Sequence, residues 1–167
     1  MESREFSSAV TQDEHILAAL AHASVILPFW GLIGAIVVWA TQREKSRFVG
    51  FQALQAIAYQ LALIIGGFAG GVCHFCSFFA TFLLMPVGIF VAEGTGDPSA
   101  EGLIAVITTF FTVFFPFCLL GVFMLIGLAF VLYGLYGAVR VLQGHDFRYV
   151  VVGRWLEQYL NREEVAE

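Results

Sequence analysis

Four side chains near residue 55 have the types and spacing of a specific polar site. Gln52, Gln55 and Tyr59 are three and four residues apart, with Gln60 beside them, and this spacing gives one helical face. Amides in a membrane helix must reach the interface or bond a neighbouring helix. This polar seam (Gln52, Gln55, Tyr59, Gln60) is therefore a candidate vestibule lining or partner contact. The plainer alternative is an interfacial turn that bonds headgroups, water and the neighbouring helix.

A second candidate is the motif formed by Cys73, His74 and Cys76. Two thiols three residues apart with a histidine between them could begin a metal site or a redox pair. A four-ligand site would need two more ligands, and the sequence offers only Cys118 and distant histidines. In a continuous helix such a pair is poorly placed to form a disulfide except near a terminus. We therefore expect packing cysteines and no metal.

Two histidines, His22 and His74, lie inside apolar runs, where ionisable residues are rare. An imidazole nitrogen can ligate a haem or a chlorophyll magnesium, and the phenylalanine-rich half of the chain would suit a macrocycle. However, the sequence has no attachment motif and no histidine pair at helical spacing. A neutral histidine can also simply bond a neighbouring helix, so we expect no cofactor.

Other catalytic patterns are missing from the sequence. It contains no Ser/His/Asp arrangement and no phosphate-binding loop, and its apolar runs hold no acidic residue, which disfavours a proton pump built on buried carboxylates. The net charge of −5 and the lack of a basic stripe argue against nucleic-acid binding. We predict that the protein is not an enzyme.

The composition indicates a membrane protein. Of 167 residues, 59% are hydrophobic and 13% charged, whereas soluble domains carry about a quarter charged residues; the mean hydropathy is +0.84. Charges are absent from 15–42, 48–92 and 102–139, and each run exceeds the about 20 residues that span a bilayer. We predict an all-α, polytopic protein with the lipid bilayer as its first partner.

The charge distribution predicts the topology. Basic residues accumulate in short cytoplasmic loops. In this sequence they form two groups, the first of Arg43, Lys45 and Arg47 and the second of Arg140, Arg148 and Arg154, and both groups are predicted to be cytoplasmic. The loop 93–101 has only acidic charges and is predicted outside. One membrane crossing therefore separates each basic segment from this loop. We predict a protein of the cell (inner/plasma) membrane whose N-terminus is outside and whose C-terminus is cytoplasmic.

These rules predict three long helices, at about 15–40, 48–84 and 102–141, within a transmembrane domain of 15–142. Kinks are expected at Pro28 and Pro116, and a bend over 85–92. The alternative has five shorter helices, with a hairpin turn at the glycines of 66–71. If that stretch is helical, its small residues instead suit helix packing. The predicted helix-packing glycines are Gly66, Gly67, Gly70, Gly71, Gly127 and Gly134.

The two ends of the chain are predicted to lie outside the transmembrane domain. Residues 1–14 are a polar lead, and 161–167 form an acidic tail. The segment 143–160 mixes charged and aromatic residues, which is typical of an interfacial amphipathic helix.

The seam region carries a family resemblance. Three parts of the chain carry it: Phe48, Val49, Phe51, Ala53, Gln55, Ala56 and Gln60 in the seam region, the segment ALAHAS (19–24), and the tail GHDFRYVVVGRWL (144–156). Together they resemble a family of small bacterial membrane proteins that includes MamF and MmsF. That family is distantly related to the membrane subunit of the chloroplast Tic import translocon. The resemblance implies three membrane helices. The family's histidine is replaced here by Gln52, so its chemistry does not carry over.

The function expected from these patterns is that of a structural or accessory membrane subunit, in a homo-oligomer or a larger complex of membrane proteins. A Tic-like conduit for a polypeptide or solute is the alternative. A pigment-, haem- or metal-binding subunit using His22 or the Cys73/His74/Cys76 motif is weaker.

Overall fold

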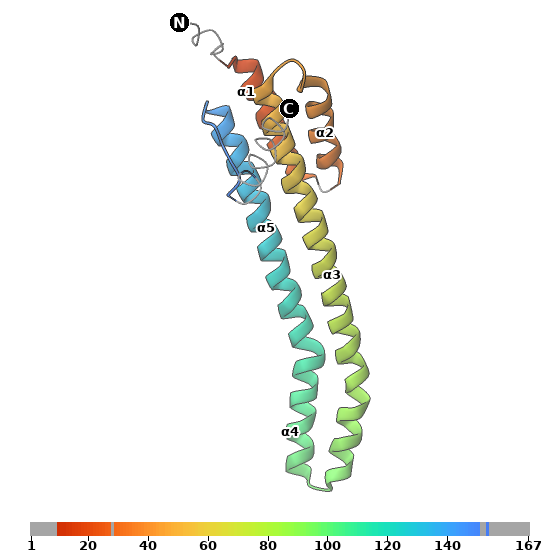
Figure 1. The fold of residues 1–167 in the computed structure, drawn as a ribbon. Helices are drawn as coiled ribbons and strands as arrows, with labels where there is room; N and C mark the ends of the chain where they lie inside the picture. Colours follow the sequence, from red (N-terminus) through yellow and green to blue (C-terminus); the bar gives the residue numbers. More distant parts are fainter. Residues whose placement is uncertain (1–9, 28, 151–152, 154–167) are drawn as a thin grey trace, which may run out of the picture. The chain divides into compact units, whose positions relative to one another are not determined.

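The computed structural model describes residues 10–27, 29–150 and 153. All regular structure in this part of the chain is helical, which confirms the all-α prediction (Figure 1). In chain order the elements are α1 (Gln12–Ala23), the 3₁₀ turn η1 (Ser24–Ile26), α2 (Trp30–Gln42), α3 (Arg47–Thr95), α4 (Pro98–Thr109), the π-helical turn η2 (Phe110–Phe114) and α5 (Phe115–Leu142).

The single helix predicted over 15–40 is wrong, because α1 and α2 are separate helices that contact each other. Proline disfavours the helical conformation of the residue before it, and Leu27, which precedes Pro28, has extended angles (φ −102°, ψ 97°). Phe29 then takes a positive φ of 63°. At Gly31 a Cβ would collide with the carbonyl oxygen of Ser24, so only glycine allows this close turn.

The start of α1 has a complete capping box. The Thr11 hydroxyl accepts from the Glu14 backbone N–H at 3.3 Å, and the Glu14 carboxylate accepts from the Thr11 backbone N–H at 2.7 Å. These bonds satisfy donors that the first turn of a helix leaves free. The polar lead predicted for 1–14 therefore enters the helix from Gln12 onward.

Helix α3 is longer than predicted. It runs without interruption through the glycines of 66–71 and through Pro86, so neither the hairpin turn of the five-helix alternative nor the bend predicted over 85–92 is present. One proline removes a single backbone hydrogen bond, and apolar helices of this kind tolerate the loss. The helix ends before Gly96, whose φ of +62° reverses the chain.

The helix predicted over 102–141 begins earlier, at Pro98, behind an Asp97 cap that accepts from the Ser99 N–H at 2.9 Å. Its irregularity is the π-turn η2, just before Pro116. A proline ring collides with the carbonyl four residues earlier in a regular helix. A widened turn at that point relieves the collision.

Two helical stretches, Arg47–Thr95 and Pro98–Leu142, are long and apolar enough to cross a membrane, judged by length and composition. Helix α2 is apolar but shorter. In the described residues the third predicted span therefore has no helix of sufficient length.

The chain divides into two units. Unit 1 comprises the residues up to Ile64 and from Ala129 onward, and unit 2 comprises Ile65–Leu128. Unit 1 contains two clusters of buried apolar side chains, around Tyr149 and around Val49. In unit 2 only Ala92 and Pro116 are buried.

Candidate functional site

The polar seam lies in the interior of unit 1. Its members are Gln52 and Gln55, both fully buried, with Gln60 and Tyr59 only 5% and 6% exposed. They meet α1, α5 and the chain that follows α5. A buried amide must find hydrogen-bond partners or destabilise the fold by about 1–3 kcal/mol, and most of these groups find them.

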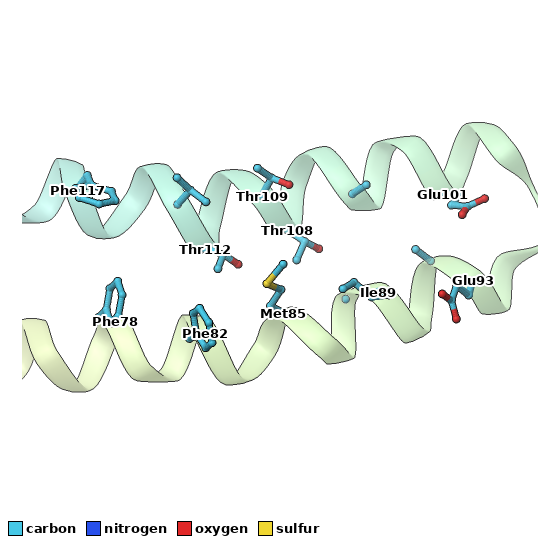
Figure 2. Close-up of a pocket in the computed structure, with 14 residues that line it drawn as sticks. Phe78, Phe82, Met85, Ile89, Glu93, Glu101, Thr108, Thr109, Thr112 and Phe117 are labelled. Atoms are coloured by element: carbon cyan, nitrogen blue, oxygen red, sulfur yellow. The ribbon is translucent and has the colours of Figure 1, made fainter.

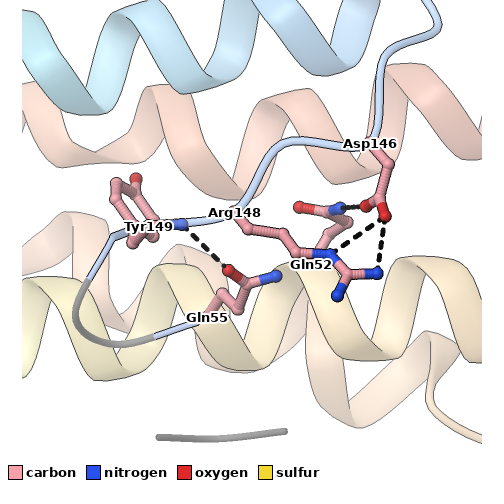
Figure 3. Close-up of polar contacts among 5 residues, drawn as sticks. All are labelled: Gln52, Gln55, Asp146, Arg148 and Tyr149. Carbon is pink, nitrogen blue, oxygen red and sulfur yellow. Dashed lines mark hydrogen bonds and ion pairs between the residues drawn. The ribbon is translucent and has the colours of Figure 1, made fainter. Parts of the chain in front are cut away.

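Gln52 joins two distant parts of the chain. Its carbonyl oxygen Oε1 lies 3.0 Å from Nε2 of His22, which is itself fully buried. Its amide nitrogen donates to Oδ1 of Asp146 at 2.9 Å (Figure 3). The other ring nitrogen of His22, Nδ1, lies 3.0 Å from the phenol oxygen of Tyr149. We call Tyr149, His22, Gln52 and Asp146 the buried relay.

The relay has a defined direction of donation. The guanidinium of Arg148 lies 2.8 Å from Oδ2 of Asp146 (Figure 3), and an ionised carboxylate only accepts hydrogen bonds. Gln52 must therefore turn its NH₂ group to Asp146 and its carbonyl to His22. It follows that His22 carries a proton on Nε2. Because burial lowers the pKa of His22 to about 4, the imidazole is neutral, and its Nδ1 accepts from the hydroxyl of Tyr149.

Tyr149 is held by two further contacts. Its backbone N–H donates to Oε1 of Gln55 at 3.2 Å (Figure 3), and its ring stacks on Tyr59 with centroids 4.1 Å apart. Burial, followed by its two tyrosine neighbours Tyr59 and Tyr133, raises the pKa of the Tyr149 phenol. The hydroxyl therefore keeps the proton that it donates. The Nε2 group of Gln55 is buried without a partner.

The remaining seam residues bond the helices around them. The Tyr59 hydroxyl donates to the carbonyl of Phe130 on α5 at 2.8 Å. The Gln60 amide donates to the Ser24 hydroxyl at 2.9 Å and to the Ala21 carbonyl at 3.3 Å. The seam thus hydrogen-bonds α1, η1 and α5 within unit 1, as the neighbouring-helix alternative describes.

Over 143–150 the chain after α5 differs from the helix predicted for 143–160, whereas Gly153 is helical and its N–H donates to the carbonyl of Tyr149 at 2.9 Å. Residues 143–150 form a turn and irregular chain. Phe147 and Tyr149 are buried, whereas Asp146, Arg148 and Val150 are exposed. This alternation with period two is visible in the sequence and could have signalled an extended segment. Most of 151–160, like the tail 161–167, lies outside the described residues.

The predicted packing glycines fall into two groups. A Cβ on Gly134 would lie 2.8 Å from Val25, and one on Gly70 would lie 3.1 Å from Phe123. The others face open space in the structure: Gly66, Gly67, Gly71 and Gly127.

The cysteine–histidine motif stays dispersed. Cys73, Cys76 and Cys118 are free and exposed, and His74 packs edge-on against Phe123. Among the described residues, no three His, Cys, Asp or Glu side chains are grouped so as to hold a metal ion.

The basic residues of the predicted charge anchor are at the surface or partly buried. Arg43 lies over the ring of Trp39, 4.9 Å from its centroid, and 3.6 Å from the carboxylate of Glu44. Lys45 and Arg47 are exposed, Arg140 is partly buried and Arg148 pairs with Asp146 as above. Arg154 falls outside the described residues.

Comparison with known proteins identifies one family. Residues 13–94 match the model of MamF_MmsF, the magnetosome magnetite crystal formation protein family, which confirms the predicted resemblance. The matched segment contains α2 and nearly all of α1 and α3, with His22 and the whole seam. No curated protein and no solved structure matches the chain.

Proposed function

Since residues 13–94 belong to the MamF_MmsF family, we propose that the protein is a magnetosome-associated membrane protein that takes part in magnetite crystal formation. Its role in this proposal is that of a non-enzymatic accessory subunit, which supports crystal growth by its place in the membrane and by contacts with other membrane proteins. The family's name supports a part in magnetite crystal formation, and the structure supports an accessory role in it.

The observation that carries the accessory role is the buried relay. Its polar groups, on α1, α3 and the chain after α5, are occupied by one another. A reactive centre needs a group that a substrate can reach, and the most distinctive polar residues of this chain are closed within unit 1. Such a network stabilises one packing of the elements, because breaking it leaves buried groups unpaired.

The membrane location is proposed from two features. The stretches Arg47–Thr95 and Pro98–Leu142 have the length and composition of membrane spans. Basic residues flank them at Arg47 and Arg140, and the turn between them, 96–97, has only an acidic charge. Because basic residues favour the cytoplasmic side, this turn faces away from the cytoplasm. Each of the two helical stretches then crosses the membrane once.

Gene deletion and complementation in a magnetosome-forming cell test the role in crystal formation. We expect deletion to change the size or number of magnetite crystals seen by electron microscopy, and the intact gene to restore them. A chain with Cys73→Ser and Cys76→Ser should restore them equally, since no reaction is assigned to these thiols. Unchanged crystals after deletion would refute the proposal, and a need for either thiol would refute its non-enzymatic part.

Cysteine labelling tests the topology. In a background without the three native cysteines, Ser99→Cys in the turn region and Lys45→Cys before α3 should react with an impermeant maleimide from opposite sides of the membrane. Labelling of both positions from the same side would overturn the single crossing by α3.

A further inference from the structure

A groove lies within unit 2, between α3 on one side and α4, η2 and the start of α5 on the other (Figure 2). Its volume is about 510 Å³, within the range of small-molecule sites. The character of its walls changes along its length. Phe78, Phe82 and Phe117 line one end, and Glu93 and Glu101 line the end next to the 96–97 turn (Figure 2).

Hydroxyl groups line the middle of the groove. A threonine in an apolar helix usually donates its hydroxyl to a carbonyl three or four residues earlier, as Thr41 and Thr81 do here at 2.8 Å. The hydroxyls of Thr108, Thr109 and Thr112 make no hydrogen bond within the described chain. The hydroxyls of Thr109 and Thr112 are therefore available to a polar group bound in the groove, whereas that of Thr108 lies against Gly88.

The π-turn η2 forms part of this wall. Thr112 and Val113 belong to both η2 and the groove. Such turns are rare and occur frequently at functional sites. On the opposite wall Gly88 allows Thr108 to approach closely, since a Cβ there would lie 2.5 Å from the Thr108 hydroxyl oxygen and 2.8 Å from its methyl carbon. The two walls are thus in contact at this point, and the groove extends to either side of it.

The charge at the acidic end has no internal counterpart. No lysine or arginine occurs between Arg47 and Arg140, so unit 2 contains three carboxylates, at Glu93, Asp97 and Glu101, and no basic side chain. Carboxylates next to an apolar region favour a cationic group, and a cationic ammonium can also donate hydrogen bonds to them. A lipid head group with a net negative charge would be repelled.

We propose that this groove binds a membrane lipid with an amine head group. The hydrocarbon chain lies against the phenylalanines, ester oxygens accept from the threonine hydroxyls, and the ammonium donates to Glu93 and Glu101. The phosphate between the esters and the ammonium faces water at the open side of the groove, and the ammonium offsets its charge. This order of apolar chain, ester and ammonium matches the order of the groove's walls. The inference rests on the proposed membrane location and is independent of the role in crystal formation.

Native mass spectrometry of the full-length protein in mild detergent tests the proposal. The probes are phosphatidylethanolamine and phosphatidylglycerol with identical acyl chains, which share every group except the cationic head. We expect the protein to bind phosphatidylethanolamine about tenfold more tightly, as two partly exposed charge contacts would provide. Equal binding, or tighter phosphatidylglycerol binding, would overturn the proposal.

Two variants locate the site. Glu93→Gln combined with Glu101→Gln should remove the preference between the lipids, whereas the matched surface change Glu44→Gln should leave it intact. Thr112→Val, which keeps the side-chain shape and removes the hydroxyl, should weaken phosphatidylethanolamine binding by a few fold. A double Gln variant with undiminished preference would place the lipid elsewhere. Cysteine labelling of the same double variant confirms that it inserts, so lost binding is distinguishable from a failed membrane location.

Discussion

The two units of this chain use the same kind of apolar helix in opposite ways. Unit 1 has a buried core that includes His22 and the glutamines of the seam, whereas unit 2 has two buried residues in 64 and presents its phenylalanines outward. The difference is in the polar residues. Where α3 carries amides, other segments fold onto it to satisfy them. Where α3 carries no amide side chain and most of its residues are apolar, nothing requires them to be enclosed by protein.

The strongest test of this contrast compares two histidines. His22→Ala removes the centre of the relay and leaves Gln52 Oε1 and the Tyr149 hydroxyl buried without partners, so we expect a loss of about 3 kcal/mol in unfolding free energy. His74→Ala, in unit 2, should cost less than about 1 kcal/mol because the ring is only partly buried. Thermal unfolding in one detergent measures both. Equal losses would show that the two units are held by the same forces.

A glycine pair tests the packing side of the contrast. Gly134→Ala should destabilise the protein by about 1–3 kcal/mol, because the new methyl meets the stiff side chain of Val25. Gly127→Ala meets open space and should be neutral or stabilising by up to about 1 kcal/mol through helix propensity. The midpoint of denaturation reports both changes. A neutral Gly134→Ala would mean that α5 is not packed against η1 in this way.

A smaller effect is expected at the surface end of the relay. Asp146→Asn keeps an oxygen that accepts from Gln52 but removes the pairing with Arg148, which is half exposed, so the loss should be about 0.5–1 kcal/mol. Hydrogen exchange at the Tyr149 amide, bonded to Gln55, should accelerate by a few fold. Glu101→Asn in unit 2 is the control and should leave that amide unchanged.

The smallest effect concerns pH. A hydrogen bond from Ser46, followed by those from Thr11, holds the pKa of Glu14 below its usual value. A carboxyl with a lowered folded-state pKa stabilises the fold at pH values above its unfolded pKa, and this contribution is lost as pH falls through the lowered value. The protection of the Thr11 amide against exchange, measured relative to its intrinsic exchange rate at each pH, should therefore fall in acid, and a Glu14→Gln variant should show no such dependence. Unchanged protection in the native chain would contradict the capping box.

The sequence predicted much of α3 and the seam, because spacing and composition are local properties. The period of Gln52, Gln55 and Tyr59 places them on one face whatever surrounds the helix. What the sequence did not provide was their partner. The contact between His22 and Tyr149 joins residues 127 positions apart, and no local pattern contains that information.

At two prolines the structure differs from the sequence-based prediction for local reasons. Pro28 was expected to kink one helix, but the pre-proline restriction acts on Leu27 and separates two. Pro86 was expected to end a helix, yet α3 passes through it, since a single missing N–H in a long apolar helix costs less than ending the helix would. Proline thus had opposite outcomes at two positions, and the residues around it decided which.

The direction of the buried relay also bears on which sequences can share this fold. Position 52 requires a side chain that accepts from one neighbour and donates to another on its opposite side, and Gln52 does so with its two amide atoms. A neutral imidazole has the same pairing of one acceptor and one donor. A Gln52→His substitution would thus keep one acceptor and one donor at this link of the relay, and it would preserve the connection while changing the residue.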